Sequence, residues 1–196
     1  MTNLLKIINN SKLKKFLILL ILLGIYIFIS AYSYVGAVCQ DLENNLFRLH
    51  VIANSDSEKD QNLKYIVRDE LISYMNSLCS NCTNKEDAIN IAQNHKNDFY
   101  NIARETIVNN GFNYDVEIQI GNFTFPTKTY GDITLPAGYY DALRVKIGKA
   151  EGKNWWCVMF PPLCFVDVSS GIVPEKSKEL LRRKFIRRRL FLNFRK

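Results

Sequence analysis

The sequence is poor in the residues and motifs on which several classes of enzyme depend. Its 196 residues include nine glycines and two histidines. It contains no glycine-rich loop of the kind that holds phosphate groups, which argues against a nucleotide-binding domain of that type. No glycine-rich oxyanion loop or nucleophile elbow accompanies Cys157 or Cys164. The sequence also has no internal repeat and no low-complexity segment, which excludes a solenoid or a tandem array.

Charge is missing from the 25 residues between Lys15 and Asp41. About 20 apolar residues are enough to cross a bilayer, so this run predicts a transmembrane or signal helix, and residues 1–38 are assigned to it. Lysines precede the run and acids follow it, which places the N-terminus in the cytosol and the remaining chain outside. A weak cleavage site after Ser33 leaves a removable signal peptide open, whereas the length of the run favours a retained anchor.

The remaining charge is unevenly distributed. Residues 39–174 carry 12 basic and 17 acidic side chains, whereas residues 175–196 carry 10 basic and 2 acidic ones. In this tail, apolar and basic residues interleave in a pattern typical of an amphipathic helix on an anionic membrane, although a solvated helix packed by one apolar edge on the sheet is the alternative. The side chains expected to contact the membrane are Arg182, Arg183, Lys184, Arg187, Arg188 and Arg189. Because the domain is expected to be exported, nucleic acid is not an expected partner.

Hydrophobic periodicity predicts one α+β domain over residues 39–174. Its elements are expected in the order strand 46–53, helix 58–78, helix 85–109, strand 114–120, surface connection 126–138, strand 139–147 and strand 153–160. Ser57 is expected to cap the first helix, and Asn110-Gly111 to end the second. This order predicts two helices packed on a mainly antiparallel sheet, followed by the basic C-terminal helix.

Both tryptophans lie side by side, in the run from Asn154 to Asp167. Successive residues of a strand point to opposite faces, so Trp155 and Trp156 are expected on opposite sides of one strand, with at least one of them in the core. From Trp155 to Phe160 the run is apolar at every position, which favours a central strand covered on both faces.

Five cysteines in an exported domain favour disulfide bonds. Cys157 and Cys164 flank a double proline and are the expected pair, with buried free thiols as the alternative. Cys79 and Cys82 are spaced to close a tight loop at a helix end, which leaves Cys39 unpaired. A zinc site built from Cys79, Cys82 and the two histidines His50 and His95 has a suitable ligand set but is disfavoured, because His95 lies on an apolar helical stripe. No metal or other cofactor is expected.

The segment after the first strand is the expected partner-contact site. His50, Asn54 and Asp56 lie at the end of this strand and in the following loop, and binding residues are often carried by loops. A helix cap with a hydrogen-bonded turn is the competing explanation. A Cys-His hydrolase that pairs His50 with Cys157 or Cys164 is the competing function, although nothing in the spacing favours it.

Three separate segments resemble the stage II sporulation protein R family. They are Arg48-x-His50-Val51-x-Ala53-Asn54-Ser55-Asp56 with Asp60-Gln61-x-Leu63-Lys64 and Val67-Arg68-Asp69; Tyr130-Gly131 with Pro136-Ala137-Gly138-x-Tyr140-x-Ala142-Leu143-Arg144-Val145-x-Ile147-Gly148; and Asn154-Trp155-Trp156-Cys157 through Pro161-Pro162-Leu163-Cys164. The resemblance covers residues 46–168.

This resemblance implies a non-enzymatic signalling protein of endospore-forming bacteria. It implies export from the forespore, with the protein either anchored in the forespore membrane or released into the space between the two sporulation membranes. The implied partner is a membrane-embedded aspartic-type protease of the mother cell, which cleaves the precursor of the early mother-cell sigma factor once it is activated.

Overall fold

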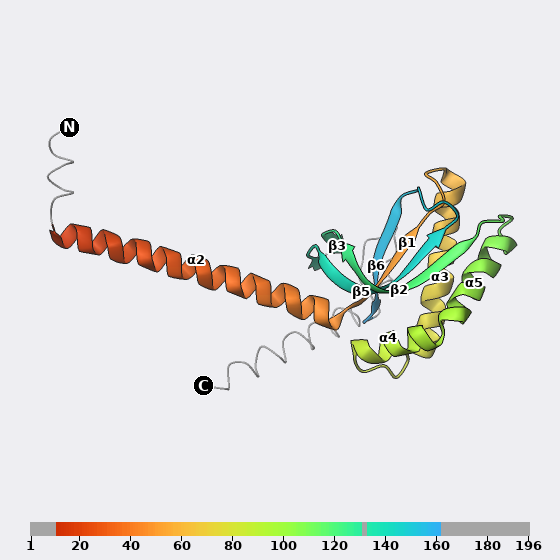
Figure 1. The fold of residues 1–196 in the computed structure, drawn as a ribbon, viewed down its shortest axis with the longest axis horizontal. Helices are drawn as coiled ribbons and strands as arrows, with labels where there is room; N and C mark the ends of the chain where they lie inside the picture. Colours follow the sequence, from red (N-terminus) through yellow and green to blue (C-terminus); the bar gives the residue numbers. More distant parts are fainter. Residues whose placement is uncertain (1–10, 131–132, 162–196) are drawn as a thin grey trace. The chain divides into compact units, whose positions relative to one another are not determined.

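The computed structural model describes residues 11–130 and 133–161 (Figure 1). The chain divides into two compact units, with the division between Asp41 and Leu42. Each unit is described here by itself.

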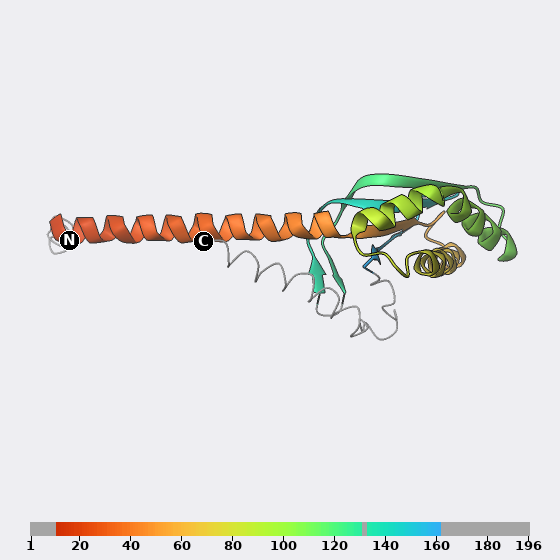
Figure 2. The same ribbon diagram turned by 90° about the horizontal axis from the view of Figure 1, so that it is seen from below.

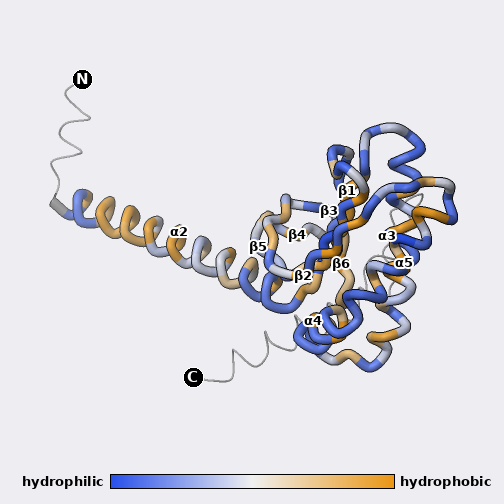
Figure 3. Tube along the Cα trace, turned by 45° about the vertical axis from the view of Figure 1, so that its right-hand side comes forward, coloured by the Kyte–Doolittle hydropathy of each residue, from blue (hydrophilic) through white to orange (hydrophobic). Residues whose placement is uncertain are grey.

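The first unit consists of most of helix α2 (Ser11–Asn45), whose last residues belong to the second unit. The large apolar side chains from Phe16 to Ile29 are exposed. Figure 3, which colours the chain by hydropathy, shows the hydrophobic residues of α2 concentrated toward its N-terminal part. Among the described residues, α2 is the one helix that is long and apolar enough to cross a membrane. The predicted apolar N-terminal helix is therefore confirmed as a helix, and its composition fits a membrane anchor or a signal sequence.

The second unit is an α+β domain, as predicted. Its elements are β1 (Phe47–Ile52), α3 (Glu58–Leu78), α4 (Lys85–Asn94), α5 (Lys96–Asn109), β2 (Val116–Phe125), β3 (Lys128–Tyr130), β4 (Ile133–Leu135), β5 (Gly138–Ile147) and β6 (Asn154–Phe160). Four strands form a sheet in the order β2-β5-β1-β6. Strand β1 is parallel to β5, whereas the β1–β6 and β2–β5 pairs are antiparallel. The parallel pair requires a long crossover, which helices α3, α4 and α5 supply.

The main core lies between the sheet and the three helices. Every second residue of β1 points toward the helices, and all three of these side chains are completely buried. The strand residues of this core are Phe47, Leu49, Val51, Val116, Ile118, Leu143, Val145, Ile147, Cys157, Met159 and Phe160. A register shift between Phe47 and Arg48 lets both Met159 and Phe160 join this core.

The opposite face of the sheet carries a second cluster, which the β3–β4 hairpin helps to cover. Figure 2 shows this hairpin leaving the plane of the four-stranded sheet. The buried residues of the cluster are Leu46, Phe125, Leu135, Tyr140, Ala142 and Val158. The sequence predicts only a surface connection over 126–138, because prolines and glycines are typical of loops. It does not predict the two three-residue strands, since their stability depends on contacts with residues far away in the sequence.

Strand β6 is the terminal strand of the sheet among the described residues, whereas its apolar sequence predicts a central strand. The two expectations about its faces nevertheless hold. Cys157 faces the helices, and Val158 lies in the cluster on the opposite side. An edge strand can therefore be apolar on both faces, provided that helices cover one face of the sheet and a hairpin covers the other.

The helix predicted over 85–109 is two helices, α4 and α5, which meet at His95. The Nδ1 atom of His95 lies 2.7 Å from a carboxylate oxygen of Asp98, and the hydroxyl of Tyr74 donates to the same carboxylate at 2.9 Å. Asp98 lies in the first turn of α5, where a negative charge favours a new helix start. This contact with α3 fixes the break between α4 and α5, and the periodicity of the segment alone does not reveal it.

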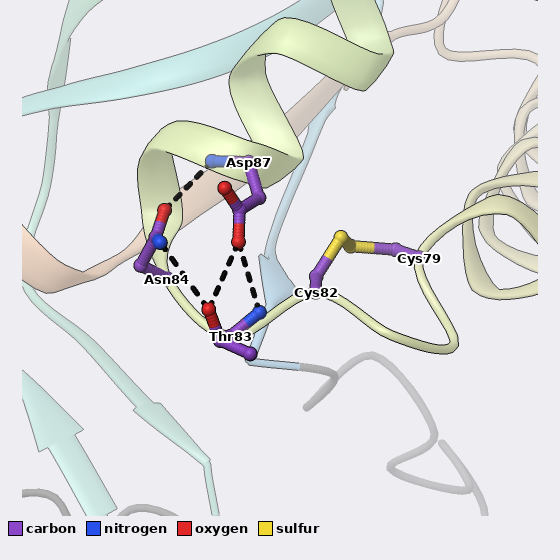
Figure 4. The surroundings of a disulfide bond; sticks show 5 residues. All are labelled: Cys79, Cys82, Thr83, Asn84 and Asp87. Atoms are coloured by element: carbon purple, nitrogen blue, oxygen red, sulfur yellow. Dashed lines mark hydrogen bonds between the residues drawn. A yellow bond between two sulfur atoms is a disulfide. The ribbon is translucent and has the colours of Figure 1, made fainter.

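A disulfide bond joins the end of α3 to the start of α4 (Figure 4). Cys79 is the C-cap of α3, and it is bonded to Cys82 across two intervening residues. Immediately after the bond, Asn84 caps α4 by accepting the backbone N–H of Asp87, and the Asp87 carboxylate accepts the N–H and hydroxyl of Thr83. The tight loop expected at this helix end is confirmed, and among the described residues Cys39 is the free cysteine.

Loss of the Cys79–Cys82 bond is expected to destabilise the domain modestly. In the chain-entropy description, closing a loop of this size contributes about 2 kcal/mol to the free energy of unfolding. The variant with both Cys79→Ser and Cys82→Ser should therefore unfold at lower denaturant concentration than the unchanged chain, and Cys39→Ser should not. Equal unfolding midpoints for the double variant and the unchanged protein would contradict a stabilising role.

Candidate partner-contact site

The loop between β1 and α3 is hydrogen-bonded to the turn between β5 and β6. The backbone N–H groups of Glu151 and Gly152 donate to the carbonyl oxygens of Asn54 and Ala53, at 3.2 and 2.9 Å. Side chains add two more bonds, since the Asn54 amide oxygen accepts the N–H of Lys149 and the Asp56 carboxylate accepts that of Lys153. The two segments therefore act as one structural unit, which directs the chain into β6.

Asp60 is the centre of this unit on the helix side. One of its carboxylate oxygens accepts the amide of Asn54 at 2.8 Å and the hydroxyl of Ser55 at 2.5 Å. Burial by itself raises the pKa of the Asp60 carboxyl, but the hydrogen bonds from Ser55 and Asn54 outweigh it and hold the pKa below its usual value. Ser57 caps α3 as predicted, by accepting the backbone N–H of Asp60.

Asn54 and Asp56 thus stabilise the folded domain through these hydrogen bonds. This agrees with the alternative interpretation of the segment as a helix cap with a hydrogen-bonded turn. Asp56 is exposed and Asn54 is half-buried. Their contact with a partner stays a prediction.

His50 lies on the face of the sheet opposite the helices. Its ring stacks on that of Trp156, with centroids 3.7 Å apart, and its Nε2 atom lies 2.7 Å from the amide oxygen of Asn154. An oxygen acceptor at Nε2 assigns the proton to this nitrogen, so Nδ1 is an acceptor; it is buried and has no hydrogen-bond partner among the described residues. Burial lowers the pKa of His50 to about 4, and the charges of Arg144 and Arg48 act in the same direction. His50 is therefore neutral near pH 7.

Arg48, two residues before His50, is completely buried on the same face. Its guanidinium lies 4.2 Å from the ring centre of Phe125 and 4.8 Å from that of Tyr140. It donates to the hydroxyl of Tyr130, which in turn donates to the carbonyl oxygen of Trp156. Burial lowers the pKa of Arg48. The hairpin residue Tyr130 thus links two strands of the sheet through a buried basic side chain.

Trp155 occupies the helix-facing side of β6. The guanidinium of Arg68 lies 4.4 Å from the ring centre of Trp155, and the ring of Tyr65 meets Trp155 edge-on with centroids 5.4 Å apart. Since Trp156 stacks on His50 on the other face, the prediction that the two tryptophans point to opposite sides is confirmed. The sequence analysis did not predict that Arg48 and Arg68 are buried. The one indication in the sequence is that each basic residue stands between residues of the predicted core.

The structure separates the two groups of the competing hydrolase. Cys157 pairs with Leu49 and faces the helices, whereas His50 pairs with Trp156 and faces the opposite way. Paired residues share a face, so the sheet lies between the Cys157 sulfur and the His50 ring. A catalytic pair of His50 with Cys157 is therefore excluded, and Cys164 lies outside the described residues.

The structure tests some of the remaining predictions about the cysteines and leaves others open. Cys157 is buried and disulfide-bonded. Its predicted pairing with Cys164 stays a prediction, because Cys164 is outside the described part of the chain. Cys79 and Cys82 are bonded to each other, so neither is a thiolate ligand for the alternative zinc site. Residues 11–130 and 133–161 contain no group of three potential metal ligands.

The predicted membrane contacts of the basic tail, Arg182, Arg183, Lys184, Arg187, Arg188 and Arg189, all lie outside the described residues.

Gly152 is expected to tolerate no side chain. A Cβ atom there would lie under 3.0 Å from the backbone carbonyl of Ser55, and backbone cannot move aside as the end of a side chain can. Gly152→Ala should lower the free energy of unfolding by about 1–3 kcal/mol. Gly121→Ala is the matched control, since its Cβ would meet only the ring of Phe123 at 3.6 Å. Similar denaturation curves for the two variants would refute the close approach at Gly152.

His50 is expected to make the domain sensitive to mild acid. Its pKa is about 4 in the folded domain and about 6.5 when unfolded, so the unfolded chain binds the proton more tightly. The stability due to neutral His50 is complete above pH 6.5 and is lost as the pH falls toward 4, by on the order of 3 kcal/mol. His50→Gln should flatten this slope in urea titrations, whereas His95→Gln should retain it. The contribution of Asp60 is lost only below about pH 4. A slope unchanged by His50→Gln would contradict the burial of a neutral ring.

Comparison with known proteins agrees with the motifs that run through this site. The family model of stage II sporulation protein R matches residues 43–170. The stage II sporulation protein R of Bacillus subtilis (strain 168) is 36% identical over 138 residues, which cover 70% of this chain and 62% of that protein. No solved structure matches the chain. The matched region contains the whole sheet and all three of its covering helices, and this chain belongs to the stage II sporulation protein R family.

Proposed function

We propose that this protein is an exported sporulation signal that activates a membrane-embedded aspartic-type protease of the mother cell. The activated protease then cleaves the precursor of the early mother-cell sigma factor. The observation that carries the proposal is membership of the stage II sporulation protein R family across the entire folded domain. The matched region spans 62% of the length of the Bacillus subtilis relative, so the activity of the whole protein is part of this proposal.

Helix α2 supports the export that this function requires. It precedes the domain, and its apolar run has lysines on its N-terminal side and acids on its C-terminal side. This polarity favours a domain outside the cytosol, anchored in the forespore membrane or released between the two membranes. For a domain anchored in or released next to a membrane, an anionic lipid surface is the proposed contact of the basic segment 175–196.

The arrangement of the polar groups supports binding in preference to catalysis. His50 is held neutral between an indole ring and an amide, and the fold keeps it on the opposite face from Cys157. Asn54, Asp56 and Asp60 are engaged in hydrogen bonds that hold two loops together. These residues shape a rigid surface, which suits a protein that acts by contact.

Co-expression in a host that does not sporulate tests the proposal. The full chain, the protease and the sigma-factor precursor are produced together, and cleavage of the precursor is followed by immunoblot. Cleavage should require this chain and should disappear when the protease lacks its catalytic aspartate. A precursor that stays intact while all three proteins accumulate would refute the proposal, as would cleavage by the chain without the protease.

A further inference from the structure

Basic and aromatic side chains lie together where helix α3 meets strand β6. We call Lys64, Tyr65, Arg68 and Trp155 the α3–β6 seam. Besides its contact with Trp155, the guanidinium of Arg68 lies 5.1 Å from the ring centre of Tyr65, and the Lys64 ammonium lies 4.7 Å from the same ring. Tyr65 and Trp155 are half-buried, so the aromatic rim of the seam reaches the surface.

Two hydrogen-bond donors in the seam have no acceptor. They are Nη1 of Arg68 and Nε1 of Trp155, both buried and both without a partner among the described residues. Buried polar groups are nearly always paired in folded proteins, because an unmet donor costs free energy. Both atoms are donors, and they belong to a guanidinium and an indole ring that lie against each other, so what the seam lacks is an acceptor.

The seam itself contains no acidic side chain, although the charge of Asp56 acts to raise the pKa of Lys64. Lys64 is 1% exposed, and its ammonium donates to two uncharged oxygens, of Gln61 and of the Lys153 backbone. Burial, followed by the charge of Arg68, lowers the pKa of Lys64 to about 8. Among the described residues, the one carboxylate paired with Arg68 is that of Asp69, which is 62% exposed. Nε and Nη2 of Arg68 both meet this one carboxylate oxygen, so the buried guanidinium is compensated by a single, mostly exposed partner, and its Nη1 is left over.

We infer that the α3–β6 seam is a docking surface for an aspartate or glutamate side chain of a protein partner. A carboxylate accepts hydrogen bonds from a guanidinium and an indole N–H together, and it brings the charge that the seam lacks. Tryptophan, tyrosine and arginine are also the residues that carry most binding energy at protein interfaces. An anionic lipid surface fits less well, because it favours clusters of exposed basic residues, whereas the seam has two buried ones.

The inference rests on the proposed function, since it assigns the seam to the extracytoplasmic part of the protease. The inference specifies the surface of the partner that binds here. It should present an acidic side chain next to apolar surface that covers Tyr65 and Trp155. The seam lies on the helix side of the sheet, away from His50 and Trp156.

Trp155→Phe tests the donor, because it keeps an aromatic side chain in the seam and removes the unmet N–H together with part of the indole ring. The full chain is purified in detergent, and its thermal unfolding and its binding to the co-purified protease are measured. The variant should remain folded with at most a modest fall in its unfolding temperature, since the loss of a buried unpaired donor offsets part of the cost of the smaller ring. Its affinity for the protease should fall about tenfold or more, the usual effect of losing a hydrogen bond to a charged group. Trp156→Phe, on the opposite face, is the matched control and should bind as the unchanged chain does.

Arg68→Gln tests the charge, with Arg144→Gln as its control because Arg144 also stacks on an aromatic ring, that of Phe123, but on the other face. Arg68→Gln should reduce precursor cleavage in the co-expression assay, and Arg68→Lys should restore part of it. If the Gln variant fails to fold, the Trp155→Phe result decides.

The outcomes separate the inference from the proposed function. Failure of the unchanged chain to promote cleavage overturns the function and the inference together. Cleavage and protease binding by folded Trp155→Phe and Arg68→Gln at the level of the unchanged chain overturn the inference alone. Weaker sedimentation of these variants with phosphatidylglycerol vesicles, with protease binding intact, also overturns it in favour of a lipid contact.

Discussion

The alternation of side chains along β1 is the constraint on which the rest of the domain depends. This strand is hydrogen-bonded on both sides, to β5 and to β6. Leu49 and Val51 enter the core beneath the helices, while Arg48 and His50 enter the cluster on the other face. A register slip of one residue would exchange the two sets. The Arg48 guanidinium would then lose the hydroxyl of Tyr130 and the rings of Phe125 and Tyr140 and lie among aliphatic side chains, at a cost of several kcal/mol. The pairing of the whole sheet is therefore fixed by this one strand.

Aromatic rings lie against the buried basic groups of this domain, and among Arg48, Lys64 and Arg68 it is Arg68 that is paired with a carboxylate, that of Asp69. Arg48 lies between Phe125 and Tyr140, and Arg68 lies over Trp155. A cation–π contact contributes about 0.5–2 kcal/mol, which is less than the cost of removing a full charge from water. Although residues 39–174 carry an excess of acid, that acid is mostly at the surface, and the interior retains uncompensated positive charge.

Local patterns predicted the parts of this fold that depend on local interactions. Strand β1, helix α3 with its Ser57 cap and strand β5 follow from periodicity and end signals within each segment. The β3–β4 hairpin does not, because it is held by Tyr130 reaching Arg48, which lies 82 residues earlier. The break at His95 depends on Tyr74 of another helix, and the terminal place of β6 depends on the order of all four strands.

The site was predictable to the same extent. Sequence reasoning singled out His50, Asn54 and Asp56 by their place at the end of a strand and in the loop after it, and their contact with a partner stays a prediction. It did not find that Asn54 and Asp56 hold the β5–β6 turn. It found the two tryptophans and their opposite directions, since alternation is a local property. It could not find their partners, Arg68 and His50, because stacking across a sheet or between a helix and a strand joins residues far apart in sequence.

The two faces of the sheet differ in how completely this chain closes them, and this difference bears on recognition. Arg48 is completely buried and donates to a hairpin of its own chain, although its Nη1 atom, like Nδ1 of His50, also has no hydrogen-bond partner among the described residues. Arg68 has only an exposed neighbouring carboxylate, and its unmet donor lies beside half-exposed rings. A protein that activates an enzyme by contact must bind the active state more tightly than the inactive one, and the free energy for this has to come from interactions that folding leaves unmade. In the described part of this chain, the α3–β6 seam is one place where such unmet donors lie beside half-exposed aromatic rings.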